Sequence, residues 1–333
     1  MKRSTIIITA LLSIIFTSLG QYRPDILGEG FEQRTIDLGV DYSGKVEATL
    51  VRTTPHIDSD RAILYLHGFN DYFFQREMAH RFNDSLYNFY ALDLRKYGRS
   101  LSEDQTPFEV REMEEYFEEI DSAVVAMRRE GIRTIILMSH STGGLTSSLY
   151  AKRDEASPRI DGLILNSPFL DMNLGWILEE LFLPVVAKIG NYYPNWIVVR
   201  DPTTAYFESL DRDHKGEWSY DTSMKFVSSP PTRAGWLRAI HNGHTQIQKG
   251  ANIGIPILLM YSDKSIVSPI WIEEYQCSDA VLDVKDIKKY GDKLGSKVTH
   301  VEIKDGMHDL ILSGEKAREK VYQSIFEWIE SVF

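Results

Sequence analysis

The segment ILMSHSTGGLTSSLY, residues 136–150, decides the fold because a strand pattern becomes a helix pattern across a very short turn. An apolar run rich in Ile, Leu and Met ends at Ser139, His140 and Ser141, and a helix-compatible segment follows directly. A turn this tight strains its central residue and exposes that side chain at the carboxyl edge of a sheet. Bulk two positions away would collide with the turn, and the small Ser139 and Gly143 fit. The segment therefore predicts Ser141 as a nucleophile, although Ser139 replaces the usual first glycine of G-x-S-x-G.

A serine hydroxyl is a weak nucleophile until an imidazole takes its proton and a carboxylate orients that imidazole. In this architecture the acid and then the histidine follow the nucleophile along the chain, each after a later strand. The segment ILLMYSDKSIVSP places Asp263 directly after a strand, and VEIKDGMHDLILS places His308 after the last strand. Asp305 and Asp309 are closer to His308 in sequence, but neighbours on one loop rarely reach the far ring nitrogen. We therefore expect Asp263 as the acid and His308 as the base.

The negative charge that develops on the substrate oxygen requires backbone N–H donors aimed at it. One donor should be the residue after the nucleophile, Thr142. The other should come from the loop after an early strand, LYLHGFND, where we expect the amide of Phe69. We expect His67 to fix this loop through hydrogen bonds to the backbone, and His140 to point away from the site into packing.

Short apolar runs alternate with helical patterns from about residue 46 onward, which is typical of a mostly parallel sheet covered on both faces by helices. Strands are expected at residues 46–51, 62–66, 89–92, 134–138, 162–165, 256–261 and 297–303. Amphipathic helices are expected at residues 107–131 and 315–333. The alternation stops between about residues 171 and 250, which indicates a mainly helical cap inserted into one α/β domain, because the sheet needs strands from both sides.

The composition is that of an ordinary globular chain, with 43% hydrophobic and 26% charged residues among 333. The formal net charge of -11 argues against nucleic acid or an anionic membrane surface as an electrostatic partner. Cys277 is the only cysteine, so no intramolecular disulfide can form. These features leave small neutral or zwitterionic substrates open and do not define an oligomeric state.

The N-terminal segment has the order of charge, apolar core and small residues that is typical of a signal peptide. Lys2 and Arg3 precede an apolar stretch over residues 6–19, and Gly20 follows. The stretch is shorter than the ~20 residues that cross a bilayer. We therefore expect a signal peptide over residues 1–20, a mature domain over residues 21–333, and export to the periplasm or the medium.

Five motifs in this order, LHGFND, ALDLRKYGRS, SHSTGG, YSDKSIVSP and GMHDL, resemble the α/β-hydrolases of the monoglyceride lipase, lysophospholipase and serine aminopeptidase-like group. The resemblance extends from about residue 61 to the C-terminus, and residues 171–250 stand where that family carries its cap. It implies an α/β-hydrolase fold with Ser141, Asp263 and His308 as the triad. It also implies oxyanion donors at the Phe69 and Thr142 amides.

These observations predict a serine hydrolase that cleaves carboxylic esters through an acyl-enzyme, without a cofactor or a metal. The resemblance implies a small-molecule or lipid ester as the partner, of monoacylglycerol or lysophospholipid type, with transient contact to lipid surfaces. One alternative is an aminopeptidase-like amide hydrolase, in which Glu179, Glu180 and Glu208 capture a substrate ammonium. Another is a non-catalytic exported binding protein. His241 and His244 have a spacing that suits a metal on a helix, but no nearby Cys or carboxylate cluster accompanies them. The apolar cap stretch over residues 174–199 fits either an acyl-binding groove or packing against the sheet.

Overall fold

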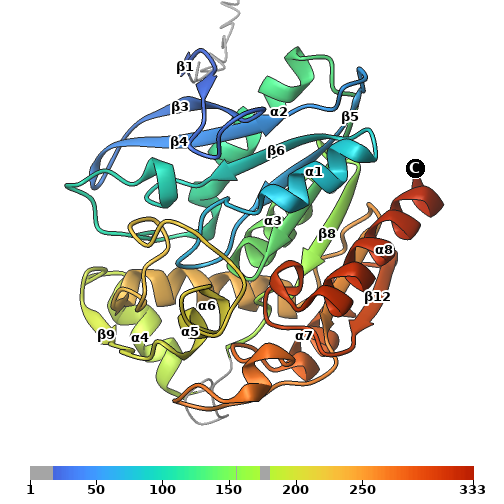
Figure 1. Ribbon diagram of the computed structural model, residues 1–333. Coiled ribbons are helices and arrows are strands. Elements are labelled where there is room, and N and C mark those ends of the chain that lie inside the picture. The colour runs from blue at the N-terminus through green and yellow to red at the C-terminus, as the bar shows by residue number, and fades with distance from the viewer. Residues whose placement is uncertain (1–17, 155, 173–180) are drawn as a thin grey trace, which may run out of the picture.

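The computed structural model describes residues 18–154, 156–172 and 181–333, and within these ranges it contains one large sheet (Figure 1). Its strands are β1 (Ser18–Leu19), β2 (Arg23–Pro24), β3 (Glu32–Asp41), β4 (Gly44–Thr53), β5 (Arg61–Leu66), β6 (Asn88–Asp93), β7 (Thr134–His140), β8 (Gly162–Asn166), β11 (Ile257–Ser262) and β12 (Val298–Ile303). Their order is β1-β3-β4-β6-β5-β7-β8-β11-β12, with β2 also paired to β3. The pairs from β6 through β12 are parallel, whereas β3, β4 and β6 pair antiparallel.

Helices connect these strands and cover both faces of the sheet (Figure 1). They are α1 (Arg76–Asp84), α2 (Phe117–Arg129), α3 (Thr142–Arg153), α4 (Leu183–Gly190), α5 (Ala205–Leu210), α6 (Ala234–Gln248), α7 (Val284–Gly291) and α8 (Glu315–Val332). Short 3-10 turns lie at η1 (Gly98–Ser100), η2 (Met113–Tyr116), η4 (Glu273–Gln276) and η5 (Leu310–Leu312). None of the helices in the described ranges is long and apolar enough to cross a membrane.

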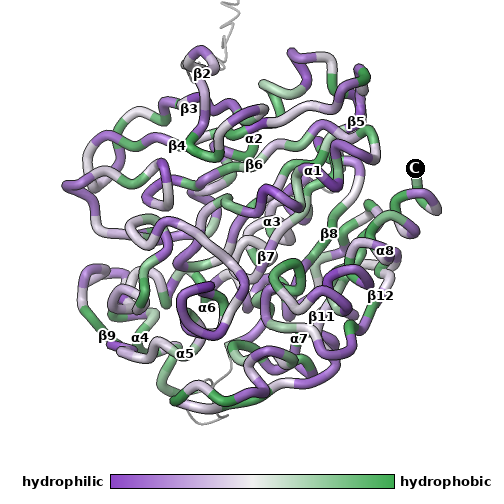
Figure 2. Tube along the Cα trace, in the orientation of Figure 1, coloured by the Kyte–Doolittle hydropathy of each residue, from purple (hydrophilic) through white to green (hydrophobic). Residues whose placement is uncertain are grey.

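The two faces of the sheet are buried in separate hydrophobic clusters because strand side chains alternate. In β5, Leu64 and Leu66 pack with residues of α2 and α3. Ile63 and Tyr65 of the same strand pack with residues of α1 and α8 on the other face. Figure 2 shows hydrophobic segments in the central strands and alternating hydrophilic and hydrophobic segments along α8. The expected α/β architecture is therefore confirmed, and burial on both faces explains why the central strands are almost continuously apolar.

The strands expected from the sequence are all present, with ends that differ by at most two residues. The C-terminal helix also forms as expected, over Glu315–Val332. Strand β3 was not expected, because its EQRTIDLGVD sequence has scattered buried positions and no apolar run. It lies near the antiparallel side of the sheet, where one face of a strand can remain polar.

The expected helix over residues 107–131 was wrong at its start. The α-helix begins at Phe117, after the 3-10 turn Met113–Tyr116. Phe108 has a left-handed φ of 62°, which breaks a helix at that point. Phe108 and Val110 are both buried in the core, so packing of this irregular segment overrides its helix-like pattern.

The inserted segment between β8 and β11 contains α4, α5 and α6, so helices form most of the regular secondary structure in its described part, and loops connect them. It also contains a two-stranded antiparallel sheet of β9 (Ile197–Val199) and β10 (Thr232–Arg233), which was not expected. Strands this short carry no readable alternation. The buried residues of α4, including Leu183 and Val186, pack against Leu237 of α6.

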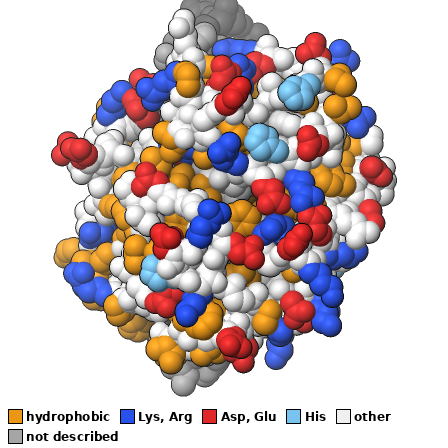
Figure 3. Space-filling model, in the orientation of Figure 1, with side chains coloured by type: hydrophobic (Ala, Val, Ile, Leu, Met, Phe, Trp, Pro, Cys, Tyr) orange, Lys and Arg blue, Asp and Glu red, His pale blue; other side chains and the backbone are white. Residues whose placement is uncertain are grey.

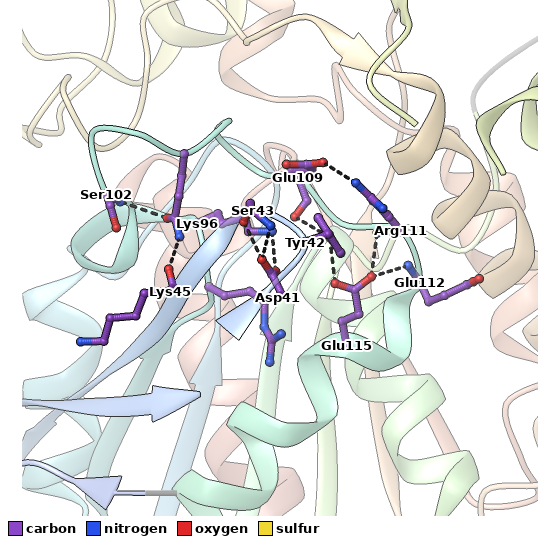
Figure 4. Close-up of polar contacts among 12 residues, drawn as sticks. Asp41, Tyr42, Ser43, Lys45, Lys96, Ser102, Glu109, Arg111, Glu112 and Glu115 are labelled. Atoms are coloured by element: carbon purple, nitrogen blue, oxygen red, sulfur yellow. Dashed lines mark hydrogen bonds and ion pairs between the residues drawn. The ribbon is translucent and has the colours of Figure 1, made fainter. Parts of the chain in front are cut away.

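Polar contacts attach the β3–β4 hairpin to the segment between β6 and α2 (Figure 4). The buried Lys96 donates from Nζ to Asp41 Oδ2 at 2.8 Å. The Tyr42 ring lies 3.6 Å from the Arg111 guanidinium, and its hydroxyl donates to Glu115 Oε2 at 2.9 Å. These contacts hold the segment that contains Phe108 against the sheet.

Helix α6 anchors the inserted segment to the sheet through a buried histidine. His244 Nε2 donates to the Phe169 carbonyl at 2.9 Å, just beyond β8. Burial lowers the pKa of His244 to about 3. The imidazole is therefore neutral in the folded protein, and its Nε2 is engaged by a backbone carbonyl.

This histidine should make the protein sensitive to acid. The unfolded chain binds a proton at His244 below pH ~6.5, whereas the folded chain does so only near its lowered pKa, so stability is lost as pH falls through this interval. The substitution His244→Gln keeps a donor for the Phe169 carbonyl. We expect it to reduce the pH dependence of the free energy of unfolding by up to about 1.4 kcal/mol per pH unit between pH ~6 and ~4. Denaturant unfolding across a pH series measures it. Parallel stability curves for the two proteins would contradict the prediction.

Candidate active site

Ser141 lies on the turn between β7 and α3, as the sequence predicts. Its φ of 52° and ψ of -118° are strained for a non-glycine residue. The Ser141 amide donates to the Asn166 carbonyl at 3.1 Å, and the Gly144 amide donates to the Ser141 carbonyl at 2.8 Å. The turn is therefore held by backbone bonds on both sides, with the Ser141 side chain at the carboxyl edge of the sheet.

The small residues beside Ser141 are needed for different reasons. A Cβ atom at Gly143 would clash with the backbone carbonyl oxygens of Leu66 and His67. Ser139 is fully buried, and its hydroxyl lies 2.7 Å from that of Ser147 in α3. Serine therefore replaces glycine at the first position of the motif because its hydroxyl has a partner in the following helix.

His308 contacts both the serine and a buried carboxylate. His308 Nε2 lies 3.0 Å from Ser141 Oγ, and Nδ1 lies 3.0 Å from Asp279 Oδ2. The other carboxylate oxygen of Asp279 accepts bonds from the Val281 and Leu282 amides at 2.9 Å and 2.8 Å. Asp279 is fully buried and His308 is 3% exposed. The arrangement can relay a proton from an alcohol to an imidazole whose orientation is fixed.

Asp263, the acid expected from the sequence, does not contact His308. Its Oδ1 accepts a bond from the Asp305 amide at 2.8 Å, so it joins the end of β11 to the loop after β12. The chain continues past Asp263 through η4 before Asp279 reaches the imidazole. The structure therefore places Asp279 in the position that we assigned to Asp263.

The sequence does contain a signal for this difference. Asp263 is followed by Lys264, which is exposed, whereas Asp279 is followed by Ala280, Val281 and Leu282. A carboxylate beside an imidazole must be buried, and apolar neighbours favour burial. Choosing the acid by its position directly after a strand was therefore wrong.

The expected oxyanion donors, Thr142 and Phe69, both lie close to Ser141. Thr142 is the first residue of α3, so its amide has no partner within the helix. Gly68 lies close to the Ser141 side chain, because a Cβ atom at Gly68 would be only 3.1 Å from Ser141 Cβ. Phe69 follows Gly68 in the chain. Both positions fit an oxyanion hole.

His67 fixes the orientation of the Gly68–Phe69 peptide. The Leu94 amide donates to His67 Nε2 at 3.1 Å, so Nδ1 carries the proton and donates to the Gly68 carbonyl at 2.8 Å. In a trans peptide the C=O and N–H groups point in opposite directions. The Phe69 amide therefore points away from His67, and it has no acceptor among the residues that the structure describes. The supporting role expected for His67 is confirmed.

His140 differs from our expectation. It is buried, but its ring lies 4.7 Å from the ring of His308 and lines the same pocket. Its Nδ1 lies 3.3 Å from the Asn166 carbonyl. Burial lowers the pKa of His140, so the ring is neutral and adds no positive charge beside His308. The side chain lies beside the site because β7 ends at His140 and the turn begins.

A pocket of about 540 Å³ opens onto Ser141 and His308. Its lining comes from the loop after β5, the inserted segment and the loop after β11, and includes Phe69, Tyr206, Phe207, Phe226, Val267 and Tyr275. A buried ion pair also lines it, in which Lys225 Nζ donates to Asp71 Oδ1 at 2.9 Å. The pocket therefore combines apolar walls with a charge pair that is internally neutralised.

Several candidates from the sequence lie elsewhere. Of the three carboxylates proposed to bind an ammonium, Glu179 and Glu180 lie outside the described residues, and Glu208 accepts a bond from Thr204 without lining the pocket. In the cap stretch, Leu183, Val186 and Val198 pack with α6, and none of residues 181–199 lines this pocket. Residues 174–180 are not described. In the described ranges, no three His, Cys, Asp or Glu side chains are grouped to hold a metal ion.

The charged turn after β6 has a structural role. Arg99 forms ion pairs with Asp25 and Asp93, each at 2.8 Å. Arg95 pairs with the fully buried Glu119 at 2.8 Å. None of these side chains lines the Ser141 pocket.

Comparisons with known proteins agree with the fold. Residues 57–315 match the family described as serine aminopeptidase, S33. Among solved structures, a monoacylglycerol lipase from Paleococcus ferrophilus is similar, with a TM-score of 0.63, 18% identity, and coverage of 85% of this chain and 99% of that chain. A soluble variant of monoglyceride lipase from Saccharomyces cerevisiae has a TM-score of 0.60 and 14% identity, with coverage of 95% of this chain and 94% of that chain. A carboxyl esterase from Bacillus coagulans has a TM-score of 0.61 and 15% identity, with coverage of 90% of this chain and 98% of that chain.

No curated protein matches the sequence significantly. At such low identities the solved structures establish the fold alone, whereas the family match extends over most of the chain. The chain therefore belongs to the serine aminopeptidase family S33 and is a hydrolase of the α/β-hydrolase fold.

Proposed function

We propose that this protein hydrolyses carboxylic esters by acyl transfer through Ser141, His308 and Asp279. The observation that carries the proposal is the continuous line of contacts from Ser141 Oγ through the imidazole to Asp279, with each distance at 3.0 Å. This line ends in a pocket large enough for a small organic substrate. No cofactor is required by this chemistry.

The mechanism follows from the positions of the donors and acceptors. His308 Nε2 takes the proton of Ser141 as its oxygen attacks the acyl carbon, and Asp279 stabilises the imidazolium through Nδ1. The Thr142 and Phe69 amides bind the oxyanion. His308 then protonates the departing alcohol, and water repeats the cycle on the acyl-enzyme.

The charges in the pocket favour an ester over an aminopeptidase substrate. Capture of a substrate ammonium needs an uncompensated carboxylate. Asp71 is paired with Lys225 at 2.9 Å, and Asp201 is exposed and accepts a bond from the Thr203 amide of its own loop. Of the two described carboxylates that line the pocket, only the exposed Asp201 lacks an ion pair, and solvent screens its attraction for a substrate ammonium.

A lipid-like ester is supported by the surface of the inserted segment. Hydrophobic side chains gather over this part of the molecule in the view of Figure 3. Those exposed around α4 and β9 include Leu181, Phe182, Val185, Tyr192, Tyr193 and Trp196. Such a surface suits transient contact with lipid. The solved structures of similar fold include enzymes titled monoacylglycerol lipase and carboxyl esterase, which fits the same substrate class.

We also propose that the mature enzyme is exported after cleavage near Gly20. Residues 1–17 lie outside the described part of the chain. Beyond the proposed cleavage point the chain is attached to the fold, since the Tyr22 hydroxyl donates to Glu130 at 3.1 Å and Asp25 pairs with Arg99. Among the described residues, cleavage after Gly20 would remove only residues 18–20, which include the short edge strand β1.

The nucleophile can be tested with a substrate panel. We expect the protein to hydrolyse acyl esters among monoacylglycerols, lysophospholipids and short esters, with weak activity on amino-acid anilides. We expect Ser141→Ala to lower kcat by roughly 10⁶-fold because the attacking oxygen is lost. A fluorophosphonate probe should label the wild type and not the variant. Faster anilide cleavage would favour the aminopeptidase alternative, and an unlabelled wild type would favour a binding protein.

The acid can be tested by comparing two aspartates. Asp279→Asn should lower kcat on the order of 10⁴-fold, because an amide stabilises the wrong imidazole tautomer and cannot compensate the imidazolium. Asp263→Asn should have little effect, since its Oδ1 can still accept from Asp305. Steady-state kinetics on one ester measures both. A larger loss in the second variant would return the acid role to Asp263.

A further inference from the structure

Asn166 is a buried amide that connects the two segments carrying the nucleophile and the base. It is the last residue of β8 and is fully buried. The parallel register places it opposite His140 of β7 and Met260 of β11. It therefore lies at the carboxyl edge of the sheet, directly beside the Ser141 turn.

The main chain of Asn166 holds the nucleophile. Its carbonyl oxygen accepts a hydrogen bond from the Ser141 amide at 3.1 Å. The same oxygen lies 3.3 Å from His140 Nδ1. Because the Ser141 backbone is strained, this bond is one of the contacts that keep the turn in place.

The side chain of Asn166 holds the loop that carries the base. Its Nδ2 donates to Asp309 Oδ1 at 2.7 Å, and its Oδ1 accepts from the Leu310 amide at 3.1 Å. These are the two residues that follow His308. One carboxamide thus makes a donor and an acceptor contact to the same short segment, which fixes both position and orientation.

The buried carboxyl group of Asp309 explains why residue 166 is an amide. Asp309 is 1% exposed, and its Oδ2 has no hydrogen-bond partner among the described residues. A buried carboxylate needs a donor, and Asn166 supplies one. Asp309 therefore binds Asn166, while Asp279 binds His308 Nδ1.

We propose that Asn166 is a positioning residue that sets the contact between Ser141 Oγ and His308 Nε2. This inference rests on the proposed acyl-transfer function. The main chain of Asn166 fixes the serine and its carboxamide fixes the histidine loop, so movement of either segment relative to the other must break a bond at this residue. A displacement of about 1 Å between reacting groups costs on the order of 10²-fold in rate.

The test compares Asn166→Asp with the swap variant Asn166→Asp/Asp309→Asn. In the single variant two buried carboxylates face each other and the bond to Asp309 exists only when they share a proton. We expect kcat and the rate of fluorophosphonate labelling of Ser141 to fall on the order of 10²-fold, with KM little changed. The defect should deepen as pH rises and the pair ionises. The swap restores a donor and an acceptor, so both rates should return to near the wild-type values.

Asn88 provides a matched control. It is a buried amide at the start of β6, and its Nδ2 donates to the Ser59 and Arg61 carbonyls at 2.7 Å and 3.1 Å, at the opposite edge of the sheet. Asn88→Asp should lower the unfolding midpoint without lowering the labelling rate. If Asn166→Asp does not fold, Asn166→Ser replaces it, because its hydroxyl is too short to bridge both contacts.

The outcomes separate this inference from the proposed function. An unlabelled wild-type protein removes the proposed function itself. A labelled wild type with an equally reactive Asn166→Asp or Asn166→Ser, or a swap that stays as slow as the single variant, overturns the positioning role alone.

Discussion

The strained backbone of Ser141 is the constraint on which the rest of the site depends. A left-handed conformation at a non-glycine residue costs about 1–3 kcal/mol and persists only when the surroundings impose it. Here the Ser141 carbonyl accepts bonds from the Gly144 and Phe169 amides, at 2.8 Å and 2.9 Å, while its amide binds Asn166. The parallel pairing of β7 with β8 brings these groups together. The sheet therefore holds the nucleophile in a conformation that the turn alone would not maintain.

Buried charges support the loops around this turn. Arg99 links Asp25 near the N-terminus to Asp93 at the end of β6, and Lys225 of the inserted segment links to Asp71. Removing one partner of a buried pair leaves an uncompensated charge, which typically costs about 3–5 kcal/mol. These pairs fix the relative positions of segments that are far apart in sequence, and the Asp71–Lys225 pair does so at the pocket wall.

The sequence predicts the parts of the fold that local pattern determines. Strands β5, β7, β8 and β11 are buried on both faces, so their apolar runs mark them closely. Ser141 lies on the turn after β7 and His308 in the loop after β12, as expected, because tight turns and strand ends have recognisable sequences. The start of α2 is not predictable in this way, since Phe108 and Val110 are held by tertiary packing in a segment with helical spacing. The orientation of His140 and the β9–β10 pair depend on the same kind of long-range contact.

The acid shows where such reasoning stops. A carboxylate at the end of a strand can orient the imidazole, or it can support the loop that carries it. Asp263 does the second, because its Oδ1 binds the Asp305 amide and its own amide donates to the Ile303 carbonyl at 3.0 Å. Asp279 does the first, with both oxygens satisfied in a dry environment. Chain order is the same for both residues, so burial distinguishes them, and the apolar residues that follow Asp279 are its sign in the sequence.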